Sequence, residues 1–401
     1  MRLKSLSFYK HPLFGDATFN FTDPKGNILD TIVLVGINGT GKTTFLNTVK
    51  DLFVNIQAEP SQHNTIKAFT LDLPKIDDSG IDPSSRGILK CHVEDSRRPF
   101  HSLVAYREIL TTSGKNFPET FPKIVYLPPF YSDEKLKSTF EPFNYSYSLD
   151  NVCNSSTVRN IPRFFATYID KEIMDNDHLV VKDAVSKACK KINTIFDTLS
   201  LNIELIGLKK DGSKLPIFKN KQGHNFDING LSSGEKQLFI RLLSLQMMSV
   251  NNSIILVDEP EVSLHPTWQQ KIVKVFQSIG ENNQIIFATH SPHILASVDI
   301  DSLRFFALTN KKIQISTCKD IAVGNHAPID IILHEFMGTS PRTPEFMTIL
   351  SNIRNLVTHN KFDTPEFENF MSEAISLAGI NDIDLALIRF EINRLKATKN
   401  D

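Results

Sequence analysis

The sequence predicts an α/β fold: a mixed sheet with flanking helices, an antiparallel β part, a helical insertion and a helical C-terminal region. Three short apolar runs predict buried strands of this sheet, at Ile32 to Val35, Ser253 to Glu261 and Gln284 to Ser291. Glycine, acidic residues or histidine stand at the ends of these runs, where ligands bind to parallel sheets. The chain has 401 residues, enough for one large domain or two to three smaller ones.

Composition indicates an ordinary soluble globular protein, with 41% hydrophobic and 22% charged residues. The formal net charge of −1 neither favours nor excludes a nucleic-acid partner. No apolar run approaches the ~20 residues that a membrane span needs, and the first residues lack an apolar signal core. We therefore expect a cytoplasmic protein without a membrane partner. The four cysteines lie far apart, so neither a zinc site nor a redox pair is indicated.

A glycine-rich segment directly follows the first buried strand. Gly36-x4-Gly41-Lys42-Thr43 matches the phosphate-binding loop, in which glycines let backbone N–H groups point at phosphate oxygens. Lys42 can reach the β- and γ-phosphates, and the Thr43 hydroxyl can ligate Mg²⁺. The alternative is a glycine turn that happens to carry a lysine. We expect nucleotide contacts from Gly36, Asn38, Gly39, Thr40, Gly41, Lys42, Thr43 and Thr44.

Acidic residues end the second buried strand. Asp258 is expected at the carboxyl end of that strand, where it can hold Mg²⁺ directly or through water. Glu259 is placed to orient and deprotonate an attacking water. His290, after the third strand, falls at the same sheet edge, close enough to sense a γ-phosphate. The alternatives are surface acids that close a strand and a structural histidine.

The segment LSSGEKQ, Leu231 to Gln237, marks the start of an apolar helix. Its exposed N–H groups would make a second anion site, because the first N–H groups of a helix have no partner within it. The alternative is a helix N-cap with no further role.

Taken in order, the phosphate loop, LSSGE, DEPEVSLHP (Asp258 to Pro266) and ATHSPHIL (Ala288 to Leu295) resemble the nucleotide-binding domain of ABC-type ATPases. More narrowly, they resemble the SMC, RecF and OLD-like branch. The resemblance covers residues 1–50 and about 225–305. It implies an ABC-type P-loop ATPase that uses ATP and Mg²⁺. The implied catalytic residues are Lys42, Glu259 and His290, and the implied metal ligands are Thr43 and Asp258.

The resemblance further implies that two copies of the chain enclose each ATP. The segment that would contact ATP on the loop of the other copy consists of Ser232, Ser233, Gly234 and Glu235. The loop from Ser263 to Pro266 would cross the interface between the copies. We therefore expect a homodimer or a higher homo-oligomer.

The sequence departs from the family pattern in three places. LSSGE stands where transporters usually have LSGGQ, which argues against a transporter subunit. His265 replaces an acid that is often found in the interface loop. No glutamine follows the strand from Lys123 to Pro129, so the residue that replaces the family's glutamine stays open.

Pattern divides the chain into four parts. Residues 1–137 carry the phosphate loop and antiparallel strands, with a hairpin in residues 1–33 and further strands in residues 66–108. Residues 138–225 are expected to form a helical insertion and a hairpin, whose lysines are a solvated face or, alternatively, a rim for DNA or RNA phosphates. Residues 226–328 complete the ATPase. Residues 329–401 form helices that pack on the core or on another protein.

A full set of nucleotide motifs without an effector motif resembles bacterial antiphage ATPases of the Septu, retron-associated and PARIS types. This implies a sensor or regulator of a separately encoded nuclease or toxin. The alternative is a RecF- or SMC-like DNA-repair or recombination ATPase that binds DNA directly. It usually needs a long coiled-coil arm, and the sequence has no heptad run of that length. Asp382 and Asp384 are more simply a helix cap than part of a nuclease site.

Overall fold

The computed structural model describes residues 1–52, 65–77, 80–92, 108–112, 120–131, 136, 146–175, 178, 180–309, 312–317, 342–380 and 382–398. Two compact units make up the chain, Met1–Ile329 and Asp330–Asp401. The first unit contains every residue that the sequence predicts to bind nucleotide or metal. No helix within these described ranges is long and apolar enough to cross a membrane.

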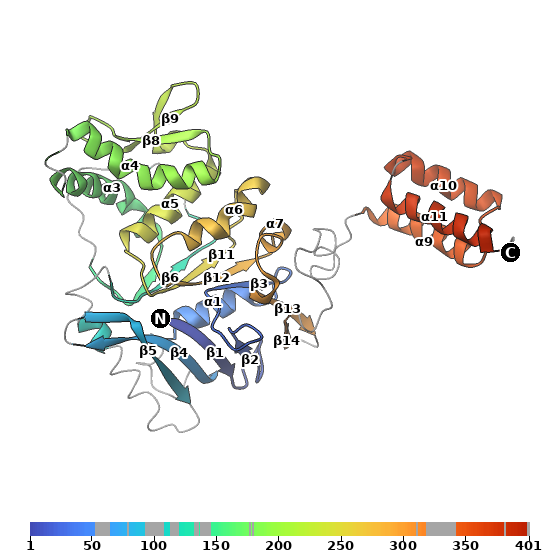
Figure 1. Ribbon diagram of the computed structural model, residues 1–401, viewed down its shortest axis with the longest axis horizontal. Helices are drawn as coiled ribbons and strands as arrows, with labels where there is room; N and C mark the ends of the chain where they lie inside the picture. Colours follow the sequence, from blue (N-terminus) through green and yellow to red (C-terminus); the bar gives the residue numbers. More distant parts are fainter. Residues whose placement is uncertain are drawn as a thin grey trace. The chain divides into compact units, whose positions relative to one another are not determined.

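A mixed sheet lies at the centre of the first unit (Figure 1). In the described ranges it has seven strands, in the order β14-β13-β3-β12-β11-β6-β7. The strands from β13 to β7 run parallel, and β14 runs antiparallel to β13. This arrangement confirms the predicted α/β class. The bounds are β14 Lys312–Ser316, β13 Leu303–Thr309, β3 Thr31–Val35, β12 Gln284–Thr289, β11 Ile254–Asp258, β6 Ile124–Leu127 and β7 Asp150–Val152.

Helices follow the strands at the carboxyl edge of this sheet. α1 (Lys42–Lys50) follows β3, α6 (Pro266–Gln277) joins β11 to β12, and α7 (Pro292–Leu295) follows β12. Every residue of β3, β11 and β12 is buried, as their nearly continuous apolar sequences predict for parallel strands covered on both faces. The three strands end side by side, so the residues that follow them meet at one edge.

A second sheet is antiparallel. Its order is β2 (Thr18–Asn20), β1 (Arg2–Phe8), β4 (Ile66–Asp77) and β5 (Gly80–His92). The structure therefore has the hairpin predicted in residues 1–33 and two of the further strands predicted in residues 66–108. The last part of that segment, residues 93–107, lies outside the described residues, and residues 108–112 are helical. The strand prediction is wrong at residue 108, because a short apolar run does not separate strand from helix by period alone.

Polar and aromatic contacts join the two sheets. Gln284, at the start of β12, accepts from the Leu3 N–H at 2.7 Å and donates to the Leu3 and Leu29 carbonyls at 3.0 and 2.9 Å. Neighbouring phenylalanine rings have centroids 4.4 to 6.4 Å apart. Because one of these rings belongs to α1, this packing fixes the helix that follows the phosphate loop. The rings belong to Phe8, Phe14, Phe19, Phe45 and Phe306.

Helices and a small antiparallel sheet follow β7. They are α3 (Ser155–Asp175), α4 (Val181–Thr198), β8 (Ile203–Leu208), β9 (Pro216–Asn220) and β10 (Asn225–Asp227). β7 lies within residues 138–225, which the sequence assigns to the insertion, but it pairs in parallel with β6 of the central sheet. The start of the insertion therefore moves past Val152. A strand of three residues, DNV, has too little apolar pattern to be found from sequence.

The lysine-rich hairpin predicted between residues 201 and 226 consists of β8 and β9. Lys209 Nζ lies 3.2 Å from an Asp211 oxygen and 3.7 Å from an Asp227 oxygen. Lys214 Nζ lies 3.5 Å from an Asp170 oxygen. These pairs favour the solvated-face interpretation, because acidic neighbours reduce the positive field that nucleic-acid phosphates need.

The described part of the second unit consists of α9 (Pro344–Thr358), α10 (Pro365–Ala378) and α11 (Ile383–Thr398). Thr343 and Thr364 cap the first two helices through their side-chain oxygens. The sequence left open whether these helices pack on the core or on another protein. They pack on one another around a shared apolar cluster, to which each helix gives one fully buried residue: Ile353, Ala374 and Leu385.

Asp382 acts as the predicted helix cap at the start of α11. Its Oδ1 accepts from the backbone N–H of Asp384 at 3.0 Å. Arg342 forms ion pairs with both carboxylates, and Arg354 with that of Asp384. Carboxylates that are paired with arginine in this way do not resemble a two-metal nuclease site.

Candidate functional site

The loop between β3 and α1 is built so closely that only glycine fits at two of its positions. A Cβ on Gly36 would lie 2.6 Å from the Phe306 carbonyl oxygen and from Thr40 Oγ1. Gly41 has φ +81°, and a Cβ there would lie 2.5 Å from Ile313 Cδ1. Gly41 also precedes the first residue of α1, so the loop leads directly into a helix N-terminus. This geometry fits a phosphate, which needs close approach to free backbone N–H groups.

The Lys42 side chain turns back onto the loop. Its Nζ donates to the carbonyl oxygens of Gly36 and Ile37, at 2.7 and 3.0 Å. Burial lowers the pKa of Lys42, although the charges of Glu259, Glu261 and Asp258 act in the opposite direction. The ammonium group therefore lies where it can exchange two carbonyl oxygens for phosphate oxygens.

The remaining loop residues have different surroundings. Thr40 is buried, and its hydroxyl donates to the Ile37 carbonyl at 2.8 Å. Asn38 and Gly39 are exposed, and Thr44, in the first turn of α1, is half-buried. Exposed backbone at the loop tip leaves room for a ligand.

Asp258 receives hydrogen bonds on both carboxylate oxygens. Thr43 Oγ1 donates to Oδ1 at 3.2 Å, and the Tyr126 hydroxyl donates to Oδ2 at 3.0 Å. Burial raises the pKa of Asp258, while these two hydrogen bonds lower it. A hydroxyl and a carboxylate oxygen from the loop and from β11 are hard ligands that fit Mg²⁺. Tyr126, from β6, was missed in the sequence analysis, since one aromatic residue in a buried strand predicts only packing.

Glu259 and His290 lie beside each other at the ends of β11 and β12. Glu259 has φ +41°, a left-handed conformation that costs roughly 1–3 kcal/mol for a residue with a side chain. Its backbone N–H donates to the Ala288 carbonyl at 2.8 Å, which ties it to β12. His290 Nδ1 lies 3.8 Å from Glu259 Oε1. The two predicted catalytic residues are thus close enough to act on one phosphate.

Glu261 positions the segment that carries His290, and the sequence analysis gave it no role. Its Oε1 accepts from the Thr289 hydroxyl at 2.7 Å and from the His290 N–H at 2.8 Å. The same oxygen lies 3.3 Å from His290 Nδ1. The buried carboxylate therefore fixes the backbone of His290.

Ser232 and Glu235 form a capping box at the start of α5 (Ser233–Met247). Glu235 Oε2 accepts from the Ser232 N–H at 2.9 Å and from its hydroxyl at 2.6 Å. Ser232 is therefore the N-cap of α5, and it is exposed together with Ser233. Gly234 is buried against the loop after β11, because a Cβ there would lie 2.3 Å from the Ser263 carbonyl oxygen. At the start of α5, Ser232 and Ser233 are thus exposed, while Gly234 packs on the loop after β11.

Two buried polar residues of α5 bind the segment after β6, the segment in which ABC-type ATPases carry a glutamine that this sequence lacks. Arg241 donates to the Pro128, Pro129 and Pro260 carbonyls at 3.1, 2.8 and 3.1 Å. Burial lowers the pKa of Arg241. Gln237 donates to the Tyr131 carbonyl at 3.0 Å. These residues escaped the sequence analysis because the surrounding apolar helix pattern predicts only a buried helix.

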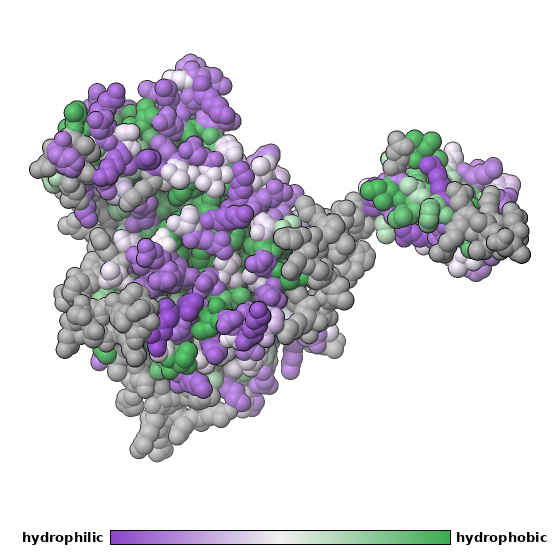
Figure 2. Space-filling view, viewed as in Figure 1, coloured by the Kyte–Doolittle hydropathy of each residue, from purple (hydrophilic) through white to green (hydrophobic). Residues whose placement is uncertain are grey.

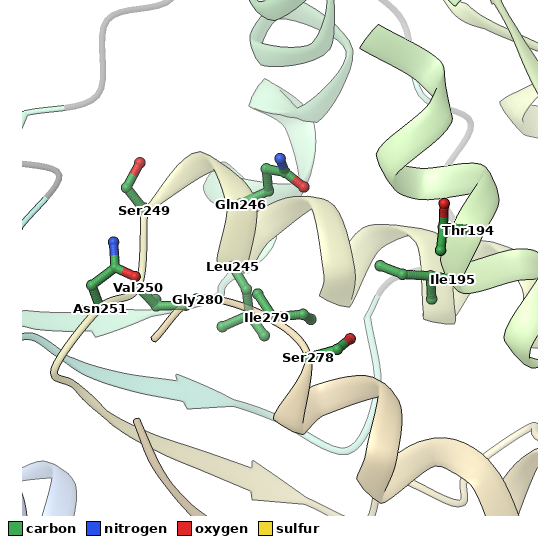
Figure 3. Close-up of a pocket in the computed structure, with 10 residues that line it drawn as sticks. All are labelled: Thr194, Ile195, Leu245, Gln246, Ser249, Val250, Asn251, Ser278, Ile279 and Gly280. Carbon is green, nitrogen blue, oxygen red and sulfur yellow. The ribbon is translucent and has the colours of Figure 1, made fainter. Parts of the chain in front are cut away.

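A cavity of about 550 Å³ lies apart from these residues, between the ends of α4, α5 and α6 (Figure 3). It lies near the amino ends of β11 and β12, since several of its wall residues belong to the segments that lead into these strands. None of the wall residues is charged, so the cavity does not suit a triphosphate. They are Thr194, Ile195, Leu245, Gln246, Ser249, Val250, Asn251, Ser278, Ile279 and Gly280.

Comparisons with known proteins agree with the motifs. Residues 145–296 match the family described as "AAA domain, putative AbiEii toxin, Type IV TA system". The chain is 24% identical over 196 residues to the Retron Vc95 probable ATPase of Vibrio cholerae serotype O1 biovar El Tor. The matched region covers 48% of this chain and 38% of that protein. The predicted resemblance to ABC-type ATPases of antiphage-defence systems is confirmed.

Two other relatives agree with this resemblance. The Retron Ec83 probable ATPase of Escherichia coli is 26% identical over 219 residues, 51% of this chain and 39% of that protein. The Septu protein PtuA of Bacillus thuringiensis is 42% identical over 50 residues, 12% of this chain and 13% of that protein. The chain thus spans about two fifths of the length of the two retron proteins that it matches.

Gly234→Ala should destabilise the protein, because the added methyl would press on the Ser263 carbonyl. We expect the free energy of unfolding to fall by roughly 1–3 kcal/mol, the usual range for overpacking. Ser233→Ala, at the exposed neighbouring position, should change it by less than about 0.5 kcal/mol. Urea denaturation of both variants measures the difference. Equal stability of the two variants would contradict the packing of α5 on the loop after β11.

Proposed function

We propose that the chain binds ATP together with Mg²⁺ and hydrolyses the γ-phosphate. The observation that carries this proposal is the hydrogen bond of 3.2 Å between Thr43 Oγ1 and Asp258 Oδ1, which joins residues 215 positions apart. It brings the phosphate loop and the acidic end of β11 to one point. Mg²⁺ held there by these two oxygens would supply positive charge for the β- and γ-phosphates. That two relatives are named probable ATPases supports the proposal.

The chain's own side chains have separate roles in this reaction. Lys42 would transfer its hydrogen bonds from the Gly36 and Ile37 carbonyls to phosphate oxygens. Glu259 would accept a proton from the attacking water while the water oxygen bonds to the γ-phosphorus and the bond to ADP breaks. His290, whose backbone Glu261 fixes, would donate to a γ-phosphate oxygen.

The start of α5 supplies the second half of the proposed site. Ser232 and Ser233 are exposed at the N-terminus of a helix of 15 residues, where free N–H groups and the helix dipole favour an anion. Their proposed ligand is the γ-phosphate of ATP on the loop of a second copy. One ATP then joins two copies, and hydrolysis removes the group that links them.

Glu259→Gln should bind ATP but hydrolyse it at least about 100-fold more slowly, because the amide is not a base. The variant should accumulate as an ATP-bound dimer or larger assembly. Lys42→Ala should lose ATP binding, because it lacks the ammonium group that would contact the phosphates. With ATP added, its mass should therefore stay that of the ATP-free protein. Light scattering with and without ATP, beside a hydrolysis assay, measures both effects. Hydrolysis by Glu259→Gln at the normal rate would contradict the role of Glu259 as the base.

For the biological role, we propose a sensor or regulator in antiphage defence that controls a separately encoded nuclease or toxin. Support comes from relatives that are named as retron and Septu proteins. The alternative of direct DNA binding draws less support, because Lys209 and Lys214 of the β8–β9 hairpin lie beside acidic residues.

Co-expression with the neighbouring gene tests this role. We expect the neighbouring product to co-purify with the chain and the pair to protect bacteria from phage. Lys42→Ala should remove this protection, because regulation needs ATP. Plaque counts should then rise at least about tenfold above those of cells with the unaltered pair. Full protection by the chain alone, with no co-purifying protein, would overturn the proposed control of an effector.

A further inference from the structure

Asp258 is held from two sides by donors on different elements. Tyr126 lies on β6, which pairs in parallel with β11 and places Tyr126 opposite Leu256. From there the phenol extends along the strand to the end of β11. Its hydroxyl lies 3.0 Å from Asp258 Oδ2, while Thr43 from α1 occupies Oδ1 at 3.2 Å.

We propose that Tyr126 is a positioning residue that holds Asp258 as a one-oxygen ligand, with Oδ1 directed to Mg²⁺ beside Thr43. This inference rests on the magnesium site of the proposed function. Mg²⁺ demands near-ideal octahedral geometry and keeps several waters, so a carboxylate in a fixed orientation suits it better than a freely rotating one. Partners behind a metal ligand tune metal affinity in this way.

The phenol itself is fixed on its other side. Tyr126 is 8% exposed, and Lys50 Nζ, at the end of α1, lies 5.6 Å from the ring centroid. The ring is therefore enclosed between α1 and the central sheet, and its hydroxyl has a defined direction.

A buried tyrosine hydroxyl needs a partner even where it has no role, and the chain offers such a case for comparison. Tyr147 is 7% exposed, and its hydroxyl donates to the Pro122 carbonyl at 2.8 Å, before the start of β6. Removal of either hydroxyl leaves a buried acceptor without that bond. Tyr147→Phe therefore controls for the loss of stability, and only Tyr126→Phe frees a carboxylate oxygen of Asp258.

The test compares Tyr126→Phe and Tyr147→Phe in the full chain carrying Glu259→Gln, which removes hydrolysis from the measurement. Binding of a fluorescent ATP analogue is titrated with Mg²⁺ and is also measured in EDTA. We expect Tyr126→Phe to raise the Mg²⁺ concentration for half-saturation about tenfold, the effect of one hydrogen bond to a charged group. Metal-free nucleotide binding by Tyr126→Phe should stay within about twofold of the parent, because no Mg²⁺ is then held by Asp258. Both properties of Tyr147→Phe should also stay within about twofold, because this variant loses no bond to Asp258.

An unchanged half-saturation in Tyr126→Phe, with a parent that depends on Mg²⁺, would overturn the positioning role and leave the proposed ATPase intact. Equal weakening of metal-free binding in both tyrosine variants would show a structural role only. A parent without any Mg²⁺ dependence would overturn the magnesium site and this inference together.

A second measurement avoids any loss of folding in Tyr126→Phe. 3-Fluorotyrosine placed at position 126 keeps the hydroxyl and reports its surroundings through the fluorine resonance. We expect this resonance to shift when Mg²⁺ is added to the ATP-bound protein, and the same probe at position 147 to stay in place. A resonance at position 126 that ignores Mg²⁺ would contradict the proposal.

Discussion

The parallel pairing of β11 with β12 on one side and β6 on the other is the constraint on which the rest of the site depends. It places Tyr126 beside Asp258 and His290 beside Glu259, although these residues come from distant parts of the sequence. β3, on the far side of β12, brings the phosphate loop to the same edge. A shift of β11 by one residue would turn Asp258 to the opposite face of the sheet and separate it from Thr43.

The buried side chains of α5 connect the two halves of the proposed site within one copy. The guanidinium of Arg241 binds carbonyls both after β6 and after β11, and Gly234 rests on the Ser263 carbonyl. A movement of α5 must therefore change contacts beside Glu259. Since Glu259 already has a left-handed backbone, small shifts there act on a strained residue. Through these contacts, binding of α5 to ATP on a second copy would change the surroundings of Glu259, the proposed base.

Sequence alone predicted the features that depend on local pattern. The phosphate loop, the strand before Asp258 and the capping residues at Ser232 and Asp382 each have a signal within a few neighbouring positions. Pairings between distant segments have no such signal. The bond from Tyr126 to Asp258 depends on the register of two strands more than 100 residues apart, and the three-residue strand β7 has almost no apolar pattern. Tertiary contacts decide both, so they appear only in the structure.

The most direct measurement of the central claim mixes two variants that should each be inactive. Lys42→Ala lacks the phosphate loop function, and Ser232→Arg would block the start of α5 with a large side chain. In a mixed pair, one intact loop faces one intact α5, so hydrolysis should return to about a quarter of the wild-type rate in an equal mixture of dimers. A mixture no more active than the two variants alone would contradict an ATP shared between two copies.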